Sequence, residues 1–491
     1  MPLPLSVCRV VCFIACATGC GRIGFDRHFG AQDASFEDGK LQDTPTADGP
    51  TPDGTVECEE TCNGTAGAWV KAFGGSSSDY GIAVDTDSAN NVYIAASFIG
   101  TVDFGGGAFD AGLGQDIIVA GFDPLGAHRW SIAHGGLASG PWYGHAIIAD
   151  LNDDIFFLGT PYGPDVSSYV SSYEQDGAYR WGGPTWLEVA KAQGLSVDAQ
   201  SRIYVTGSFS QDNDFGCGAT LQSQGSTDVF IASYDSATGA CIWAQRYGGA
   251  SSDSATDIVA AADGTTYVTG SFRGGLVAGS TTYVSRGGTD VFVSSYDGDG
   301  NHRWTITAGD AQNDIGYQLA LAGNNQLVVA GSFTGTIDFG FGELTAEVGS
   351  DIFVASFDGA DGQVKWASRI GGSSAEFPAD LQVGPNGLLY LCGNYYDTVS
   401  FLNGELHTSN GESDAFVLAY QLASGAPTAA VSYGGTGSDG CADIAFDDTG
   451  TMLVIGSFED AVDFGGTVLN AQGPRDIFLL KTQPPSACAC P

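Results

Sequence analysis

Aspartates that recur in equivalent loops are the residues of this sequence best suited to bind a ligand. One set follows paired glycines in loops such as "YGGASSD" and "YGGTGSD", and a second set begins the tripeptide Asp-Phe-Gly. Carboxylate oxygens are preferred ligands of Ca²⁺. The alternative is structural, because Asp in turns also accepts hydrogen bonds from backbone N–H groups. The residues for which we predict calcium binding are Asp79, Asp103, Asp253, Asp338, Asp439 and Asp463.

A second candidate site is aromatic and occurs in only one part of the chain. It comprises the loops "GPWYGH" (140–145), "TPYGP" (160–164) and "GPTW" (183–186). Exposed Trp and Tyr rings beside polar groups suit a sugar ring or a protein partner. Alternatively, these rings fill the space left by a shortened repeat. The candidate ligand-binding residues are Trp142, Tyr143, His145, Tyr162 and Trp186.

Catalytic motifs are absent from the sequence. It contains neither H-E-x-x-H nor G-x-S-x-G, and its six His residues do not cluster. Asp-Phe-Gly occurs four times in equivalent contexts, which indicates a turn element and not a kinase motif. The loop "RYGGASSD" (246–253) lacks the Lys and the following helix of a phosphate-binding loop. We therefore predict no catalytic residue.

The elements that must position these loops repeat along the chain. Six of the eight Trp residues recur at intervals of 61, 51, 62, 61 and 62 residues; they are Trp69, Trp130, Trp181, Trp243, Trp304 and Trp366. Each unit also contains runs such as "TYVTGSF" (266–272) and "DVFVSSYD" (290–297). Alternating apolar and small or polar residues, with Asp, Asn and Gly between the runs, are typical of strands joined by hairpin turns. Four such strands per unit predict an all-β fold, a seven-bladed β-propeller of four-stranded antiparallel blades.

The two ends of the repeat predict how the propeller closes. The last unit lacks its Trp-type strand, whereas "AWVKAFGG" (67–74) is a Trp-type strand that stands alone before the first complete unit. The N-terminal strand should therefore complete the last blade and remove its open edge. In a four-stranded blade, the loops between blades and those between the second and third strands emerge on one face. The candidate aspartates and aromatic loops should share that face.

Cysteines flank this closing strand and the last strand of the repeat. The disulfide candidates are Cys58, Cys62, Cys488 and Cys490. Four cysteines allow three pairings, and we prefer cross-pairing because two residues so close in sequence as 488 and 490 cannot form a relaxed bridge. The residues left without an assigned partner are Cys217, Cys241, Cys392 and Cys441.

The recurring pattern W-x-GG-SSD, A-x-D, N-x-Y-x-A-G-S-F, D-F-G and D-I-F-V-A-x-x-D resembles the bacterial seven-bladed β-propeller repeat family, often called SBBP or beta-propeller repeat. The resemblance covers about residues 68–482. It implies an extracytoplasmic or surface protein, usually without an assigned activity. The second unit departs from the pattern: it is about ten residues short and has "DVSSYVSSYEQD" in place of the third strand.

The N-terminal segment predicts export and lipidation. "MPLPLSVCRVVCFIACATGC" contains Arg9 and an apolar run too short to span a bilayer, which is typical of a signal peptide. Its last four residues, Ala-Thr-Gly-Cys, resemble a bacterial lipobox, so we predict lipidation of Cys20. The predicted organisation is a lipoprotein signal peptide (1–19), a flexible Asp/Pro/Gly-rich tether (20–66), the propeller (67–483) and a Cys-containing tail (484–491).

Composition narrows the function. With 57 Asp and Glu against 17 Lys and Arg, the formal net charge of -40 excludes binding to nucleic acid. We predict a monomeric, non-enzymatic binding or scaffold module for proteins or polysaccharide, anchored by lipid to the bacterial cell envelope in the outer membrane. The anchor is its only predicted membrane contact, and calcium its only predicted cofactor. The alternatives are an envelope hydrolase or lyase with its active site at the mouth of the propeller channel, and a purely structural surface component.

Overall fold

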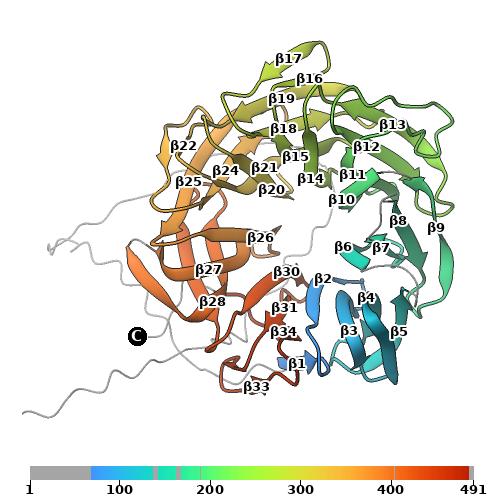
Figure 1. Ribbon diagram of the computed structural model, residues 1–491, viewed down its shortest axis with the longest axis vertical. Coiled ribbons are helices and arrows are strands. Elements are labelled where there is room, and N and C mark those ends of the chain that lie inside the picture. The colour runs from blue at the N-terminus through green and yellow to red at the C-terminus, as the bar shows by residue number, and fades with distance from the viewer. Residues whose placement is uncertain (1–67, 136–141, 162–166, 188–189, 403, 486–491) are drawn as a thin grey trace, which may run out of the picture.

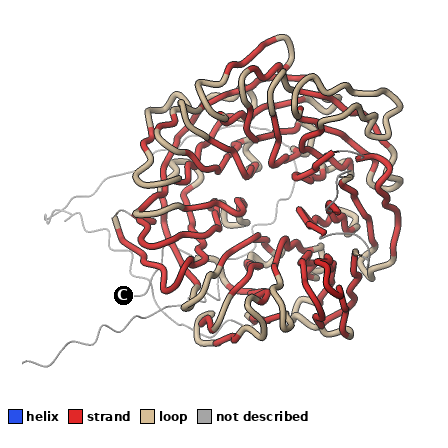
Figure 2. Tube along the Cα trace, in the orientation of Figure 1, coloured by secondary structure: helices blue, strands red, loops and turns tan. Residues whose placement is uncertain are grey.

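Strands and turns make up the whole of the described chain. The computed structural model describes residues 68–135, 142–161, 167–187, 190–402 and 404–485. These residues form 34 strands and no helix, and hence no helix that is long and apolar enough to cross a membrane (Figure 2). Runs rich in Val, Ile, Tyr and Phe favour strands, and the Gly and Asp residues between them favour turns. The predicted all-β class is confirmed.

Four-stranded antiparallel sheets follow one another along the chain, with their strands in sequence order. The first two sheets comprise β2 (Tyr80–Thr86), β3 (Val92–Asp103), β4 (Ala108–Phe122), β5 (His128–His134), and then β6 (Trp142–Ala149), β7 (Ile155–Pro161), β8 (Ser168–Tyr173), β9 (Tyr179–Leu187). The next two comprise β10 (Ala190–Val197), β11 (Arg202–Phe209), β12 (Asp228–Asp235), β13 (Cys241–Tyr247), and then β14 (Asp253–Ala260), β15 (Thr266–Phe272), β18 (Asp290–Tyr296), β19 (His302–Ala308). The shortened second unit therefore also forms a four-stranded sheet.

Two further sets of four strands are joined in one continuous sheet. They comprise β20 (Asp314–Leu321), β21 (Gln326–Phe333), β24 (Asp351–Asp358), β25 (Val364–Gly372), and then β26 (Glu376–Val383), β27 (Leu388–Leu402), β28 (Glu405–Gln421), β29 (Pro427–Tyr433). The connection is a short pairing of β25 with β27, in which Gly371 lies opposite Ser400 and Gly372 opposite Val399. The two sets are therefore joined by backbone pairing as well as by the loop between β25 and β26.

The first strand of the described chain pairs with the last. β1 (Trp69–Phe73) runs antiparallel to β34 (Asp476–Thr482), with Trp69 opposite Lys481. This sheet has the order β1-β34-β31-β30, with β31 at Met452–Phe458 and β30 at Gly440–Phe446. The first and last strands of the described chain thus lie in one sheet (Figure 1).

The sheets are arranged radially around a central space, and the innermost strands are β2, β6, β10, β14, β20, β26 and β30 (Figure 1). Antiparallel four-stranded sheets in this arrangement define the β-propeller class. The remaining strands form short hairpins between second and third strands: β16 (Gly275–Ala278) with β17 (Thr281–Val284), β22 (Thr336–Ile337) with β23 (Leu344–Thr345), and β32 (Ala461–Asp463) with β33 (Val468–Asn470).

The hydrophobic core lies between neighbouring sheets. The middle strands are buried along nearly their whole length, as β12 and β18 show, because adjacent sheets cover both of their faces. One core cluster, for example, joins Tyr204 and Val229 of the third sheet to Val268 and Phe292 of the fourth.

The recurring Trp residues connect each sheet to the next. Trp304 in β19 donates its indole N–H to the carbonyl oxygen of Gly359, in the turn between the third and fourth strands of the following sheet (3.1 Å). Gly362 of that turn has φ +75°, and a Cβ there would lie 2.9 Å from the Trp304 ring, so glycine is needed for both conformation and space. The same bond recurs as Trp69–Pro124, Trp130–Gln175, Trp181–Ser236, Trp243–Gly298 and Trp366–Leu422. We call this contact the Trp latch.

Candidate functional site

A central cavity lies between the innermost strands of the propeller. Residues of β2, β6, β10, β14, β20, β26 and β30 line it. Its charged lining residues are aspartates, and no Lys or Arg lines it within the described part of the chain. A cavity with acidic walls and no cation has a negative potential, which favours ligands with hydrogen-bond donors or positive charge.

A β-bulge turns one residue of each innermost strand out of register. The pairing of each of these seven strands with its neighbour skips one residue. A bulge redirects the extra side chain. The bulged residues are Ile82, His145, Gln193, Thr256, Tyr317, Ala379 and Ala442, and all but Tyr317 line the cavity. The side chains at the bulge therefore differ in chemical type from sheet to sheet, whereas the strands that carry them repeat.

Aspartates on the innermost strands bridge neighbouring sheets. Asp443 accepts the N–H of Val84 (2.7 Å), Asp85 that of Ala149 (2.7 Å), and Asp257 that of Leu319 (2.8 Å). The innermost strand of a propeller has a free edge, and these carboxylates satisfy part of it. Their side chains are partly exposed to the cavity but surrounded by protein, and this burial raises the pKa of Asp85 to about 6 and that of Asp257 to about 8.

Asp380 and Asp443 form a carboxyl pair in the cavity wall. Their side chains hydrogen-bond to each other, and both accept the N–H of Ile444, at 3.3 Å and 2.9 Å respectively. Burial first, and then the neighbouring charge of Asp380, raise the pKa of Asp443 well above its usual range. The raised pKa favours the protonated form of Asp443, and two adjacent carboxyls of this kind are suited to act as an acid and a base. Sequence reasoning missed it, because these residues are 63 positions apart and belong to different units of the repeat.

His145 faces the cavity from the shortened second unit. Its Nε2 lies 2.9 Å from Oγ1 of Thr160, which in turn lies 2.7 Å from Oγ of Ser168. Ser168 donates to the carbonyl oxygen of Ala190 in the next sheet (3.0 Å). Burial lowers the pKa of His145 to about 4, so its ring is neutral at neutral pH. The hydroxyl chain holds this ring at the cavity wall.

The other aromatic candidates lie in different environments. Trp142 packs edge-on against Tyr169, with ring centroids 5.5 Å apart, beside the core cluster between the first two sheets. Tyr143 is 43% exposed. Tyr162 and the side chain of Trp186 lie outside the described residues. The predicted patch therefore stays a prediction: of its described members, Trp142 packs against the core, Tyr143 is exposed and His145 lines the cavity.

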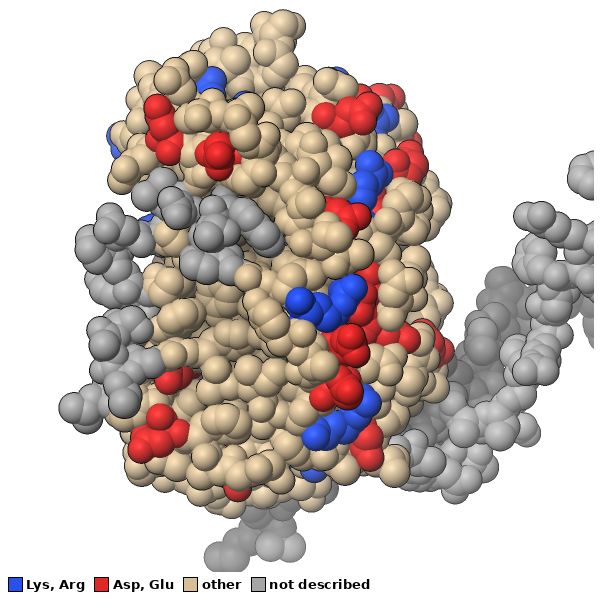
Figure 3. Space-filling model, turned by 90° about the vertical axis from the view of Figure 1, so that its right-hand side faces the viewer, with Lys and Arg blue, Asp and Glu red and all other residues tan. Residues whose placement is uncertain are grey.

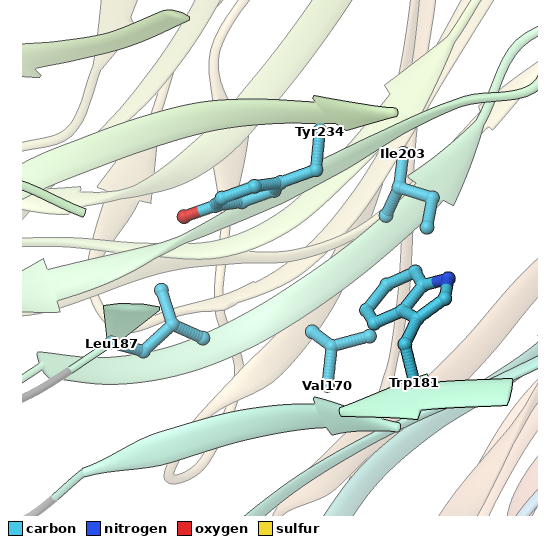
Figure 4. Close-up of a pocket in the computed structure, with 5 residues that line it drawn as sticks. All are labelled: Val170, Trp181, Leu187, Ile203 and Tyr234. Atoms are coloured by element: carbon cyan, nitrogen blue, oxygen red, sulfur yellow. The ribbon is translucent and has the colours of Figure 1, made fainter. Parts of the chain in front are cut away.

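A small apolar cavity accompanies the shortened unit. It lies between the second and third sheets, and Figure 4 shows Trp181 and Tyr234 facing it together with Val170, Leu187 and Ile203. The Tyr234 hydroxyl donates to the carbonyl oxygen of Phe215 (3.0 Å). An enclosed apolar void of this kind stays dry, so it is a packing irregularity and offers no polar recognition.

The six aspartates predicted to bind calcium form two structural groups. Asp79, Asp253 and Asp439 are fully or almost fully buried, and both carboxylate oxygens of each accept backbone N–H groups, for Asp253 those of Gly249 (2.7 Å) and Arg273 (3.3 Å). Asp103, Asp338 and Asp463 are exposed and accept N–H groups of the glycines that follow them. The described residues contain no group of three His, Cys, Asp or Glu side chains that could hold a metal ion. Calcium binding at these positions stays a prediction.

Two disulfides join cysteines to which the sequence assigned no partners. Cys217 pairs with Cys241 within the third sheet unit, and Cys392 in β27 pairs with Cys441 in β30 of the next sheet. Cys392 and Cys441 are buried. The bridged residues are 24 and 49 positions apart, which leaves no local signal for these pairings. Outside the described residues lie the lipidation candidate Cys20 and the disulfide candidates Cys58, Cys62, Cys488 and Cys490.

Charged side chains gather mainly along one edge of the propeller in side view (Figure 3). Acidic and basic side chains also form ion pairs at or near turns, such as Arg180 with Asp154 (2.7 Å) and Arg202 with Asp198 (2.7 Å). The broad middle of the same view carries few charges (Figure 3). On this face, the charged side chains are thus not spread evenly over the surface (Figure 3).

No protein-family model matches the chain. A curated relative, the regulatory protein FlaEY of Caulobacter vibrioides, is 29% identical over 183 residues, which are 36% of this chain and 19% of that protein. The chain thus matches about a fifth of the length of this relative.

Solved structures with a similar fold are propeller proteins of low sequence identity. The β-propeller domain of the Trilobed protease from Pyrococcus furiosus is 9% identical, with 83% of this chain and 96% of that chain covered and a TM-score of 0.44. BamB from Moraxella catarrhalis is 12% identical, with 82% and 85% covered and a TM-score of 0.35. Quinohemoprotein alcohol dehydrogenase from Comamonas testosteroni is 10% identical, with 85% and 76% covered and a TM-score of 0.41. The β-propeller class of this chain rests on its own sheets and their radial order.

Proposed function

We propose that this protein is an exported, lipid-anchored propeller of seven blades, closed by β1, that binds protein or polysaccharide in the bacterial cell envelope. It acts as a binding or scaffold module and as a monomer. Its ligand occupies the mouth of the central cavity, on the side of the bulged residues. Repulsion between phosphates and a net charge of -40 keeps nucleic acid away from it.

The observation that carries this proposal is the contrast between repeated and unrepeated polar residues. Repeated groups are used between sheets: Trp rings in the latches, and loop aspartates as acceptors of backbone N–H groups. Unrepeated groups, among them His145 and Gln193, line the cavity at the bulges. Residues that the fold does not need in every unit are free to recognise a ligand.

Several contacts support closure by β1. Trp69 and Lys481 both donate to the carbonyl oxygen of Pro124, at 3.3 Å and 3.2 Å. Lys481 also forms a buried ion pair with Asp447 (2.9 Å). Pairing with β1 covers the edge of β34 that could otherwise pair with a second chain, which suits a monomer.

Disulfides support export. Buried bridges such as Cys392–Cys441 form and persist in oxidising compartments and are rare in the cytosol. Together with the lipobox-like sequence that ends at Cys20, they favour an envelope location. Labelling of cells with a fatty acid should mark the wild-type chain and not a Cys20→Ser variant.

Ligand capture with the full chain tests the binding function. Gln193 is an exposed residue of the cavity wall, and Gln222 is an exposed residue of a loop of the same sheet unit outside the cavity lining. Purified bacterial polysaccharides and envelope proteins that bind the wild type should bind Gln222→Ala equally and Gln193→Ala at least about tenfold more weakly. Equal capture by both variants would contradict a ligand site in the cavity.

The Asp380–Asp443 pair favours a second candidate function, an envelope hydrolase or lyase that works at the cavity mouth. A carboxyl pair that shares a proton is suited to general acid–base cleavage. Envelope polysaccharides should then be cleaved by the wild type and not by Asp443→Asn, at unchanged melting temperature. Cleavage by neither protein would leave binding as the function, whereas cleavage by both would place the catalytic groups elsewhere.

A further inference from the structure

Five junctions between sheets carry a carboxylate at or just before the first strand of the next sheet. At four of them it is an aspartate whose two oxygens each accept a backbone N–H: Asp79, Asp253, Asp314 and Asp439. The donors lie four residues before and twenty residues after the aspartate, at 2.6–3.3 Å. Both oxygens of these four aspartates are paired, so they provide an internal standard for the carboxylate at the fifth junction.

The fifth junction carries Glu376, the first residue of β26. Glu376 is fully buried, and neither of its carboxylate oxygens has a hydrogen-bond partner within the part of the chain that the structure describes. The residue four positions earlier, Gly372, belongs here to β25 and pairs with Val399 of β27. Because that backbone is committed to the sheet, and because Glu is one methylene longer than Asp, the arrangement of the other junctions is lost.

A second unsatisfied acceptor lies beside Glu376. Asp351 is fully buried, and its Oδ2 accepts hydrogen bonds from Arg369 (2.6 Å) and from the N–H of Glu347 (3.2 Å). Its Oδ1 has no partner among the described residues. Arg369 also pairs with Glu347 (2.6 Å). The groups that act electrostatically on Glu376 are thus two carboxylates and one guanidinium, so the ionised cluster has a net charge of -2.

Burying a cluster with this net negative charge costs free energy unless a positive charge neutralises it. A buried ionised carboxylate without a partner is strongly disfavoured. Burial, followed by the charge of Asp351, raises the pKa of Glu376 to about 8, in keeping with a missing positive partner. Three acceptor oxygens of this cluster thus have no donor among the described residues.

We propose that Glu376 and Asp351 bind a divalent metal cation of the calcium class at the junction between β24–β25 and β26. A divalent ion neutralises the net charge of the cluster, and oxygen ligands are those that Ca²⁺ prefers. Since the described residues contain no group of three acidic, His or Cys side chains around one point, water or main-chain oxygens complete the shell. This site is distinct from the aspartates predicted from sequence, whose oxygens accept backbone N–H groups, and it does not depend on the proposed ligand of the cavity.

Terbium luminescence of the full chain tests this site directly. Tb³⁺ replaces Ca²⁺ at oxygen sites and is sensitised by a nearby Tyr, and Tyr395 lies opposite Glu376 in the β26–β27 pair. The wild type should show sensitised emission that Ca²⁺ displaces. Glu376→Gln and Asp351→Asn should each weaken Tb³⁺ binding by at least about tenfold, because each removes a charged ligand. Asp253→Asn, at a junction with its own N–H donors, should bind as the wild type does.

Thermal melting at pH 8 gives a second readout that does not need Tb³⁺. Ca²⁺ should raise the melting temperature of the wild type and of Asp253→Asn and leave that of Glu376→Gln unchanged. Terbium binding that is equal in the wild type and Glu376→Gln would overturn the proposal. So would a melting temperature that acid raises and Ca²⁺ does not, since Glu376 would then hold only a proton.

Discussion

Removal of one Trp latch should weaken the whole propeller by a predictable amount. Trp304→Ala removes the indole hydrogen bond to Gly359 and the packing of the ring on the turn that contains Gly362. A hydrogen bond contributes about 1 kcal/mol. Truncation of a fully buried Trp costs about 3–5 kcal/mol, and Trp304 is only partly buried, so we expect a loss of about 3 kcal/mol in all.

The same latch at the closing sheet makes this a test of the ring. Trp69 donates to Pro124 as Trp304 donates to Gly359, so Trp69→Ala should cost about the same 3 kcal/mol if β1 belongs to a closed propeller. The folded part spans residues 69–482, and an unfolding entropy of about 2 cal/mol/K per residue converts this loss to a fall of about 3–4 °C in melting temperature.

Differential scanning calorimetry of the two variants and one control measures the effect. Ile242 lies next to Trp243 in β13 but is 48% exposed, so Ile242→Ala should change stability by less than about 0.5 kcal/mol. The reasoning is refuted if Trp69→Ala lowers the melting temperature by less than a third of the fall caused by Trp304→Ala. In that case β1 would contribute little to the stability of the closed ring.

Two further predictions concern pH and the disulfide. In the folded state the pKa is about 6 for Asp85 and about 8 for Asp257, so both keep protons that the unfolded chain has lost, and stability should fall as pH rises from about 4 to about 8. In denaturant titrations at several pH values, Asp257→Asn should reduce this fall. A pH dependence of stability equal to that of the wild type would contradict the prediction. Cys392→Ser with Cys441→Ser opens a bridge across 49 residues and should cost about 4 kcal/mol in urea unfolding; a loss below about 1 kcal/mol would show that the bridge adds little.

Local pattern was enough to predict strands and many turns. Alternation in "TYVTGSF" predicts the buried β15, and the spacing of Trp residues predicts the Trp-bearing strands such as β19. Both follow from chain-local rules, since pleating places successive side chains on opposite faces and Gly or Asp favours turns. The departure of the second unit was visible as well, although it still forms a four-stranded sheet.

The partners of the predicted site residues could not be derived in this way. The loop of Asp253 was predicted on one face, but the carboxylate turns inward to two backbone N–H groups, a choice between partners that depends on the folded loop. The pairing of Asp380 with Asp443 was missed because it joins two sheets. The exchange of Asp for Glu at position 376 can be seen in the sequence, yet its burial without partners cannot.

The sequence by itself determined the all-β class, the repeat and its approximate strands, because these depend on residues that are neighbours along the chain. Only the tertiary structure decided which groups meet: the Trp latches, the two disulfides, the bulged lining of the cavity and the unsatisfied oxygens of Glu376 and Asp351. These meetings arise where one sheet packs against the next. They depend on the packing of whole sheets around the ring, which no local pattern encodes.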